Sequence, residues 1–200
     1  MRLRRDVISN RTCAFVLVIG GWLVLHADLN AQEIRIELDP AKTTVEFTLD
    51  ATLHTVHGHF KLKNGSMTFD PATGTAKGAI TVDATSGDTG NSGRDHKMHK
   101  DVLESARHPD ITFTPQRVIG KVELPGNSKV DVEGVLRVHG ADHPTTLSFV
   151  VDVTDNKEVN ATTQFAIPYQ KWGMKNPSTF FLHVKDEVQL QIAAVGKISR

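Results

Sequence analysis

The chain has 200 residues, a length that favours one domain, or two at most. Its 23 basic and 23 acidic residues give a formal net charge of zero at pH 7, so charge provides no general reason to expect nucleic acid or an anionic membrane as a partner. The single cysteine, Cys13, lies near the start of the sequence. The rest of the chain therefore has no residues for disulfides or cysteine metal sites.

Residues 1–31 have the pattern of a secretory signal peptide. Four arginines lie between positions 2 and 11, an uncharged apolar run spans 13–25, and the small residues Ala27 and Ala31 follow. The apolar run rises only about 20 Å as a helix, which is too short for the roughly 30 Å hydrocarbon core of a membrane. We expect cleavage after Ala31, a periplasmic or secreted protein without stable membrane insertion, and one domain at 32–200.

Alternating apolar and polar residues dominate the rest of the sequence, which predicts half-buried β-strands. In the segment 45–53 every odd position is apolar, and in 56–63 the apolar residues face away from the histidines and lysines. The Asn64-Gly65 pair that follows predicts a tight turn. Similar strands are expected at 77–84, 110–124, 129–140, 145–155, 159–169 and 186–196. Eight or nine strands joined by short turns indicate an all-β antiparallel barrel or sandwich.

Residues 85–109 interrupt the strand pattern. The first half of this segment has a loop composition of Gly, Ser, Thr, Asp and Asn. The second half, 95–105, has apolar residues at helical spacing, with Asp95 as its expected N-cap and Arg94 as a residue that ties the helix. We therefore expect one short helix, which ends before Pro109.

Three histidines, His54, His57 and His59, lie within six residues and suggest two interpretations. Residues two apart on a strand share a face, so His57 and His59 project together beside lysines, while His54 is expected at a bend. Zinc needs three or four ligands that converge on one point. The sequence therefore favours a solvent-facing histidine surface, with a metal site at these three residues as the weaker alternative.

The other histidines give no metal or catalytic pattern. His96 and His99 are neighbours on the expected helix but lack an HExxH motif, and His139 and His143 flank an expected turn. His108 has no partner nearby in the sequence. A GxSxG nucleophile motif is absent, and the glycine-rich run 86–93 lacks the lysine of a phosphate loop. These patterns argue against an enzyme and predict no catalytic residues.

Several segments together resemble the YceI-like family of secreted bacterial proteins. They occur in the family's order over about 39–196 and read VEFTL, VHGHF, NGSMTFDP, DTGNSGRDHKM, RHPDITF, VEGVLRVHG and YQKWGM. The resemblance implies an extended, lipocalin-like antiparallel barrel of about eight strands, with a helix near one side. It also implies that the barrel holds a long amphiphilic or isoprenoid-like lipid, of quinone or polyprenyl type, for transport or storage.

The residues expected to line the lipid site come from apolar strand faces, the short helix and one late loop. They are Val45, Phe47, Leu49, Phe60, Leu62, Ile80, Val82, Met98, Leu103, Phe113, Leu136, Val138 and Trp172. We expect no cofactor apart from bound lipid, and the sequence allows a homodimer without requiring one. Two alternatives stay open: a histidine-based metal-binding or metal-dependent hydrolytic protein on the same barrel, and a structural or stress-related protein without a ligand.

Overall fold

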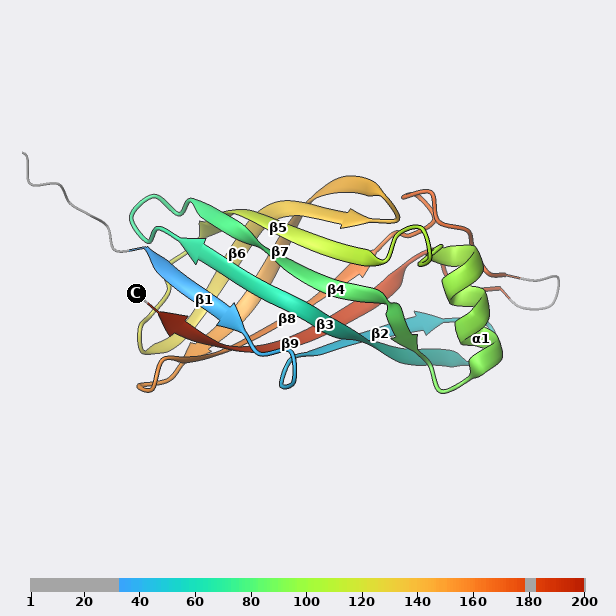
Figure 1. Cartoon of the computed structure of the whole chain (residues 1–200), viewed down its shortest axis with the longest axis horizontal. Coiled ribbons are helices and arrows are strands. Elements are labelled where there is room, and N and C mark those ends of the chain that lie inside the picture. Colours follow the sequence, from blue (N-terminus) through green and yellow to red (C-terminus); the bar gives the residue numbers. More distant parts are fainter. Residues whose placement is uncertain (1–32, 179–182, 200) are drawn as a thin grey trace, which may run out of the picture. The chain divides into compact units, whose positions relative to one another are not determined.

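Nine β-strands and one short helical segment make up the described part of the chain, residues 33–178 and 183–199 of a computed structural model (Figure 1). The predicted signal peptide and its cleavage point lie outside these residues. The strands are β1 (Ile34–Leu38), β2 (Thr44–Asp50), β3 (Thr55–Phe69), β4 (Ala76–Asp88), β5 (Asp110–Ile119), β6 (Gly126–Val138), β7 (Ala141–Val153), β8 (Glu158–Ile167) and β9 (Val188–Ser199).

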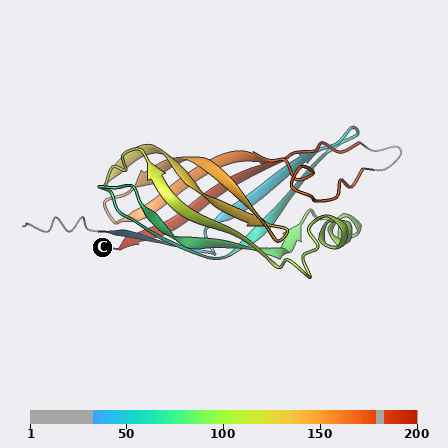
Figure 2. The same cartoon turned by 90° about the horizontal axis from the view of Figure 1, so that it is seen from above.

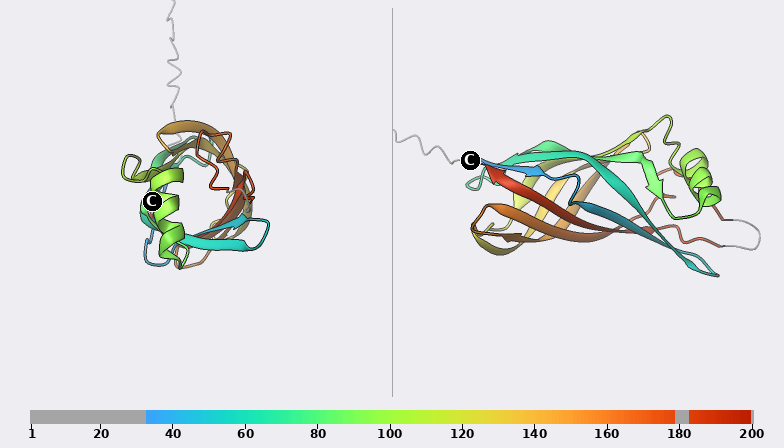
Figure 3. Two further views of the ribbon diagram at one scale, coloured as in Figure 1. Left: turned by 90° about the vertical axis from the view of Figure 1, so that its right-hand side faces the viewer. Right: turned by 60° about the horizontal axis from the view of Figure 1, so that its bottom comes forward.

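The strands form a closed antiparallel barrel. Each strand from β4 to β9 pairs with the next along the chain, β9 pairs with β2, and β3 pairs with both β2 and β4. Strand β1 pairs with the other ends of β3 and β9, so β1 and β2 share one position in the ring. The nine strands therefore occupy eight positions in the ring. Figure 2 shows the barrel from the side, and the left view of Figure 3 looks along it and shows the ring. The predicted barrel of about eight strands with one short helix is confirmed.

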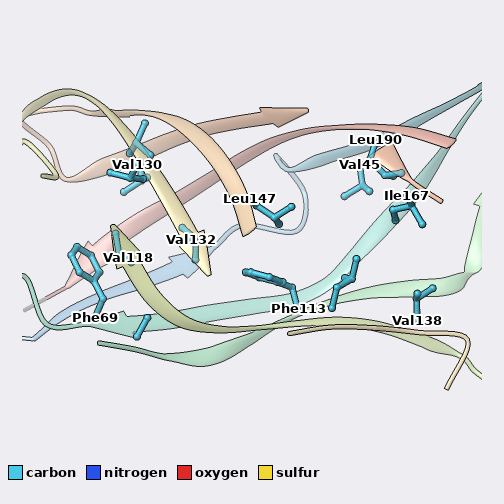
Figure 4. Packing of buried hydrophobic residues seen from close by; sticks show 14 of the residues in the cluster. Val45, Phe69, Phe113, Val118, Val130, Val132, Val138, Leu147, Ile167 and Leu190 are labelled. Atoms are coloured by element: carbon cyan, nitrogen blue, oxygen red, sulfur yellow. The ribbon is translucent and has the colours of Figure 1, made fainter. Parts of the chain in front are cut away.

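The barrel closes because its strands carry apolar side chains at every second position. In β6, Val130, Val132, Leu136 and Val138 are buried, and the charged residues Asp131, Glu133 and Arg137 lie on the opposite face of the strand. Figure 4 shows side chains from different strands pointing into the interior. Full burial of one such aliphatic side chain stabilises the fold by about 1.5–3 kcal/mol, which accounts for the fixed register of each strand.

The helical segment lies at one end of the barrel, after β4 (Figure 1). It consists of α1 (Ser92–Lys97) and a π-helical turn (Met98–Val102). The N-cap is Asn91, whose side-chain oxygen accepts a hydrogen bond of 3.0 Å from the backbone amide of Arg94. The N-cap therefore lies four residues earlier than predicted, and the expected cap at Asp95 is wrong.

The Asn64-Gly65 pair does not form the predicted turn, because β3 continues through it to Phe69. The pairing of β3 with β4 shifts between Leu62 and Asn64, which marks a β-bulge. A side chain at Gly65 would place its Cβ 2.7 Å from Cδ1 of Leu38 in β1. The glycine therefore serves the close approach of β1 to β3, and it is not a turn residue.

Candidate functional site

An apolar cavity of about 470 Å³ occupies the barrel interior next to the helical segment. Its walls are inward-facing side chains of β2 to β9, and Met98, Val102 and Leu103 of the helical region complete them. Figure 4 shows several wall residues, among them Phe113 and Leu190, pointing into this space. The volume lies in the range of about 300–1,000 Å³ that is usual for small-molecule sites.

Most of the residues predicted to line a ligand site lie in the wall of this cavity. Those that do are Val45, Phe47, Leu49, Phe60, Ile80, Val82, Met98, Leu103, Phe113, Leu136 and Val138. Leu62 lines a second cavity instead. Trp172 lines neither cavity and stacks on the imidazole of His143, with ring centroids 3.9 Å apart and planes 7° from parallel.

The second cavity, of about 150 Å³, extends the apolar interior toward the β1 end of the barrel. The two cavities share side chains in their walls, so they lie next to each other inside one barrel. The shared residues are Val45, Ile80, Val82, Phe113, Leu147 and Ile192.

Several lining residues escaped prediction although their strands were expected. They come from β7, β8 and β9 and from the segments on either side of residues 179–182. They include Leu147, Phe165, Ile167, Met174, Val184, Val188, Leu190 and Ile192. The alternation of apolar residues in these strands was a usable signal. What the sequence did not reveal was that Met174, Pro177 and Val184 lie at the same end of the barrel as the helix.

Polar groups gather at the helical end of the large cavity. His54, Thr89, Arg94, Lys97 and Tyr169 contribute to the wall there. Arg94 donates two hydrogen bonds to Thr89, of 2.8 Å to Oγ1 and 2.9 Å to the carbonyl oxygen. Lys97 donates a bond of 3.0 Å from Nζ to the carbonyl oxygen of Pro177. The polar end is therefore built by the helix and the segment that precedes β9.

The two charged side chains in the cavity wall at this end, Arg94 and Lys97, are both basic. Arg94 and Lys97 donate to neutral oxygen atoms, and among the described residues the cavity wall contains no aspartate or glutamate. Asp95 is not part of the wall, but its Oδ1 accepts from the backbone amide and the hydroxyl of Thr89, at 2.9 and 2.6 Å, so its carboxylate lies in one hydrogen-bond network with Arg94. The arrangement favours a ligand whose polar group accepts hydrogen bonds or carries negative charge.

Two further contacts hold the segment that precedes β9 against the barrel. Tyr169 is 4% exposed and donates a hydrogen bond of 2.7 Å from its hydroxyl to the carbonyl oxygen of Lys185. Burial, and to a lesser degree the charge of Asp186, raises the pKa of Tyr169 to about 12. Lys185 also donates to the carboxylate of Asp50 at 2.8 Å, and this bond lowers the pKa of Asp50.

The three clustered histidines do not converge on one point. His57 and His59 lie exposed on the outer face of β3, where Nδ1 of His57 is 3.1 Å from Oγ1 of Thr48. His54 follows the bend at 52–53 and lines the cavity on the inner side. On the helical segment, His99 is held by Ser105 Oγ at 3.1 Å and by the Gly87 carbonyl oxygen at 2.9 Å.

Among the described residues, no helix combines the length and apolar character required to cross a membrane. The family model of the YceI-like domain matches residues 37–195. A UPF0312 protein from Vibrio parahaemolyticus is 27% identical over 128 residues, and the match covers 62% of this chain. The chain spans 66% of that relative's length, which is less than two thirds.

Solved structures share the fold at low sequence identity. The structure of a polyisoprenoid binding domain from Saccharophagus degradans, implicated in plant cell wall breakdown, has a TM-score of 0.67 and 15% identity, covering 82% of this chain and 98% of that domain. BcnA from Burkholderia cenocepacia has a TM-score of 0.63 and 22% identity, covering 79% of this chain and 98% of its own. These similarities establish a shared barrel architecture.

Proposed function

This chain belongs to the YceI-like family, and on that premise we propose that it binds an amphiphilic lipid with an isoprenoid-like chain, of quinone or polyprenyl type, inside the barrel. We infer further that it works in the periplasm or outside the cell, after loss of residues 1–31, as a carrier or store and not as an enzyme. The observation that carries the proposal is the large apolar cavity with its polar groups at one end.

The cavity wall supports an apolar chain as the buried part of the ligand. Apart from the polar group at the helical end, the wall consists of aliphatic, aromatic and methionine side chains. Burial of a CH₂ group contributes about 0.8 kcal/mol, so one isoprene unit contributes about 4 kcal/mol in gross terms relative to water. The adjacent second cavity offers further apolar space for a longer chain.

The same energetics favour a protein that exchanges its lipid. A lipid that leaves a bilayer is already shielded from water, so its net gain on entering the barrel is small compared with the gross burial energy. Ordering a flexible chain inside the barrel consumes part of that gain. A store or carrier with these properties takes up and releases its ligand as the surrounding lipid concentration changes.

The two basic side chains at one end of the cavity support a defined orientation for the ligand. Arg94 and Lys97 border the cavity at the helical end, where they would meet the polar head of an amphiphile whose tail runs along the barrel. A quinone carbonyl or a phosphate provides the acceptor that these two donors require. The name of the Saccharophagus degradans domain, polyisoprenoid binding, supports the same class of tail.

Lipid extraction followed by mass spectrometry tests the proposal. Organic extracts of the purified protein should contain an amphiphile in near-equimolar amount, and lipid-free protein should take up offered polyprenyl compounds. A Val82→Trp variant should lose uptake, because Val82 lies in the wall shared by both cavities and an indole there fills the space.

The matched control is Val150→Trp, because Val150 is 48% exposed on the same barrel. This variant should keep wild-type uptake, and both variants should retain the circular dichroism spectrum of a folded β-protein. Extracts without lipid, together with no uptake by the wild-type protein, would favour the ligand-free structural protein. Equal uptake by the Val82→Trp variant would place the lipid outside the barrel.

A further inference from the structure

Glu104, His108 and His139 come together outside the strand faces, where the chain leaves the helical segment and meets the β6–β7 hairpin. Each residue offers one ligand atom, and these three atoms lie within 4.8 Å of one another. Nε2 of His139 is 3.9 Å from Oε2 of Glu104, and the imidazole centroids of His108 and His139 are 5.0 Å apart. All three side chains are half-buried, so they are reachable from solvent.

The backbone holds these side chains at one point by local geometry. The backbone amide of His108 donates a 3.0 Å hydrogen bond to the carbonyl oxygen of Glu104, so the two residues belong to one turn. On the hairpin, His139 and Gly140 both have positive φ, of 52° and 77°. A Cβ at Gly140 would lie 2.6 Å from Cε1 of His108, so the imidazole rests directly on the hairpin backbone.

Two imidazoles and one carboxylate form a donor set suited to a transition metal. Zn²⁺ accepts histidine nitrogen and carboxylate oxygen at about 2.0–2.2 Å, whereas Mg²⁺ and Ca²⁺ prefer ligands made of oxygen alone. The present spread of up to 4.8 Å requires each ligand atom to move inward by roughly 1 Å, a change that side-chain rotation provides.

Arg107 competes with a metal ion for the carboxylate of Glu104. Arg107 Nη1 lies 2.7 Å from Oε2 of Glu104, but the Arg107 side chain is 76% exposed. An ion pair this exposed contributes little to stability, so a divalent ion displaces it at small cost. The carboxylate also has a second oxygen, which is free to bind a metal while the first stays near Arg107.

We propose that Glu104, His108 and His139 bind one divalent transition metal ion, best suited to Zn²⁺, with water in the fourth position. Two of the ligands follow cavity-lining residues directly in the chain, Leu103 and Val138. The bound ion therefore joins the end of the helical segment to the β6–β7 hairpin beside the cavity. This site is distinct from the outward-facing His57 and His59, and it does not depend on what the barrel holds.

Isothermal titration with ZnCl₂ tests the site, using protein made without a histidine tag and treated with chelator. The wild-type protein should bind one equivalent of Zn²⁺, and zinc should raise its melting temperature. Glu104→Gln and His139→Asn should each weaken binding at least about tenfold, since loss of even an outer-shell metal partner costs about 10- to 100-fold. Asparagine is chosen at position 139 because it tolerates positive φ.

The controls separate loss of a ligand from loss of the fold. Glu104→Gln preserves the shape of the side chain and its contact with Arg107, so without zinc this variant should melt as the wild type does. His57→Ala with His59→Ala removes two exposed imidazoles and should leave zinc binding unchanged. A wild-type protein that takes up no zinc overturns the proposal. The proposal is also overturned if the His57→Ala, His59→Ala variant loses zinc binding while Glu104→Gln and His139→Asn keep it.

Discussion

Phe47 and Phe60 lie on the neighbouring strands β2 and β3 with their ring centroids 5.3 Å apart and their planes inclined by 38°, and both rings face the cavity. Phe47 is 7% exposed, so its ring stabilises the barrel even without a ligand. Phe47→Ala should lower the free energy of unfolding by about 3–5 kcal/mol, because it removes a buried ring and enlarges a space that already exists. Urea unfolding of lipid-free protein measures this change.

The control for Phe47→Ala is Val150→Ala on the outer face, which should change the unfolding free energy by less than about 0.5 kcal/mol. Equal, small effects of the two substitutions would show that the Phe47 ring is not packed as the structure describes.

Gly58 lies opposite Phe47 in the β2–β3 pairing, and the ring of Phe47 covers it. A Cβ at this position would lie 2.6 Å from Cε1 of Phe47. Gly58→Ala should therefore destabilise the protein by about 1–3 kcal/mol, although glycine is usually the weaker residue in a strand. Thermal unfolding followed by circular dichroism measures the change.

Gly93, in α1, is the matched comparison for Gly58. Its nearest neighbour for an added Cβ is Oδ1 of Asn91, at 3.5 Å, which is an ordinary contact. Gly93→Ala should be neutral or stabilise the protein by up to about 1 kcal/mol, because alanine favours helix. A stabilising effect at Gly58 would contradict the close contact with Phe47.

The raised pKa of Tyr169 predicts that the protein loses stability at alkaline pH. The pKa of Tyr169 is about 12 in the folded protein, against 10.0 for the unperturbed group, so between these values the folded chain keeps a proton that the unfolded chain loses. The free energy of unfolding should fall as pH rises through this window, by at most about 1.4 kcal/mol per pH unit. Urea unfolding at several pH values from 9 to 12 measures this slope.

Tyr169→Phe removes the titrating hydroxyl and should flatten the alkaline slope relative to the wild type. Lys185 also contributes above pH 10.5, because its bond to Asp50 raises its pKa, but that contribution is common to both proteins. Identical slopes for wild type and variant would show that Tyr169 does not keep its proton in the folded state.

Because Lys97 lies in the cavity wall, we expect the protein to prefer ligands with an anionic head. Replacing Lys97 by glutamine should weaken binding of an anionic prenyl phosphate roughly fivefold, about 1 kcal/mol, and should leave binding of the neutral prenyl alcohol unchanged. Lys100→Gln is the control, because Lys100 is exposed and outside the cavity wall. Fluorescence titrations with both compounds measure the two affinities, and an equal loss for both would remove Lys97 from the head site.

The strand faces were predictable because their signal is local. A period of two places Val45, Phe47 and Leu49 on one side regardless of which strands surround them. The same period of two puts His57 and His59 on the outer face of their strand and Phe113 and Leu136 on the inner faces of theirs. The lining residues contributed by β2 to β6 therefore mostly followed from the sequence once a barrel was assumed.

What escaped prediction depends on contacts between distant parts of the chain. From the sequence, Gly65 is expected in a turn, and only the structure shows that β1 packs against it. Trp172 was expected in the lining, but its ring stacks on His143. Glu104 and His139 are 35 positions apart, and the antiparallel pairing of β5 with β6 brings them within reach of one ion.

A crystal structure of the protein after incubation with a prenyl phosphate tests most directly whether the barrel interior holds the lipid. We expect one extended chain of electron density inside the barrel, beside Phe113 and Leu190, with the phosphate next to Arg94 and Lys97. Density for the lipid on the outer face, or an interior filled by collapsed side chains with no lipid, would contradict this expectation.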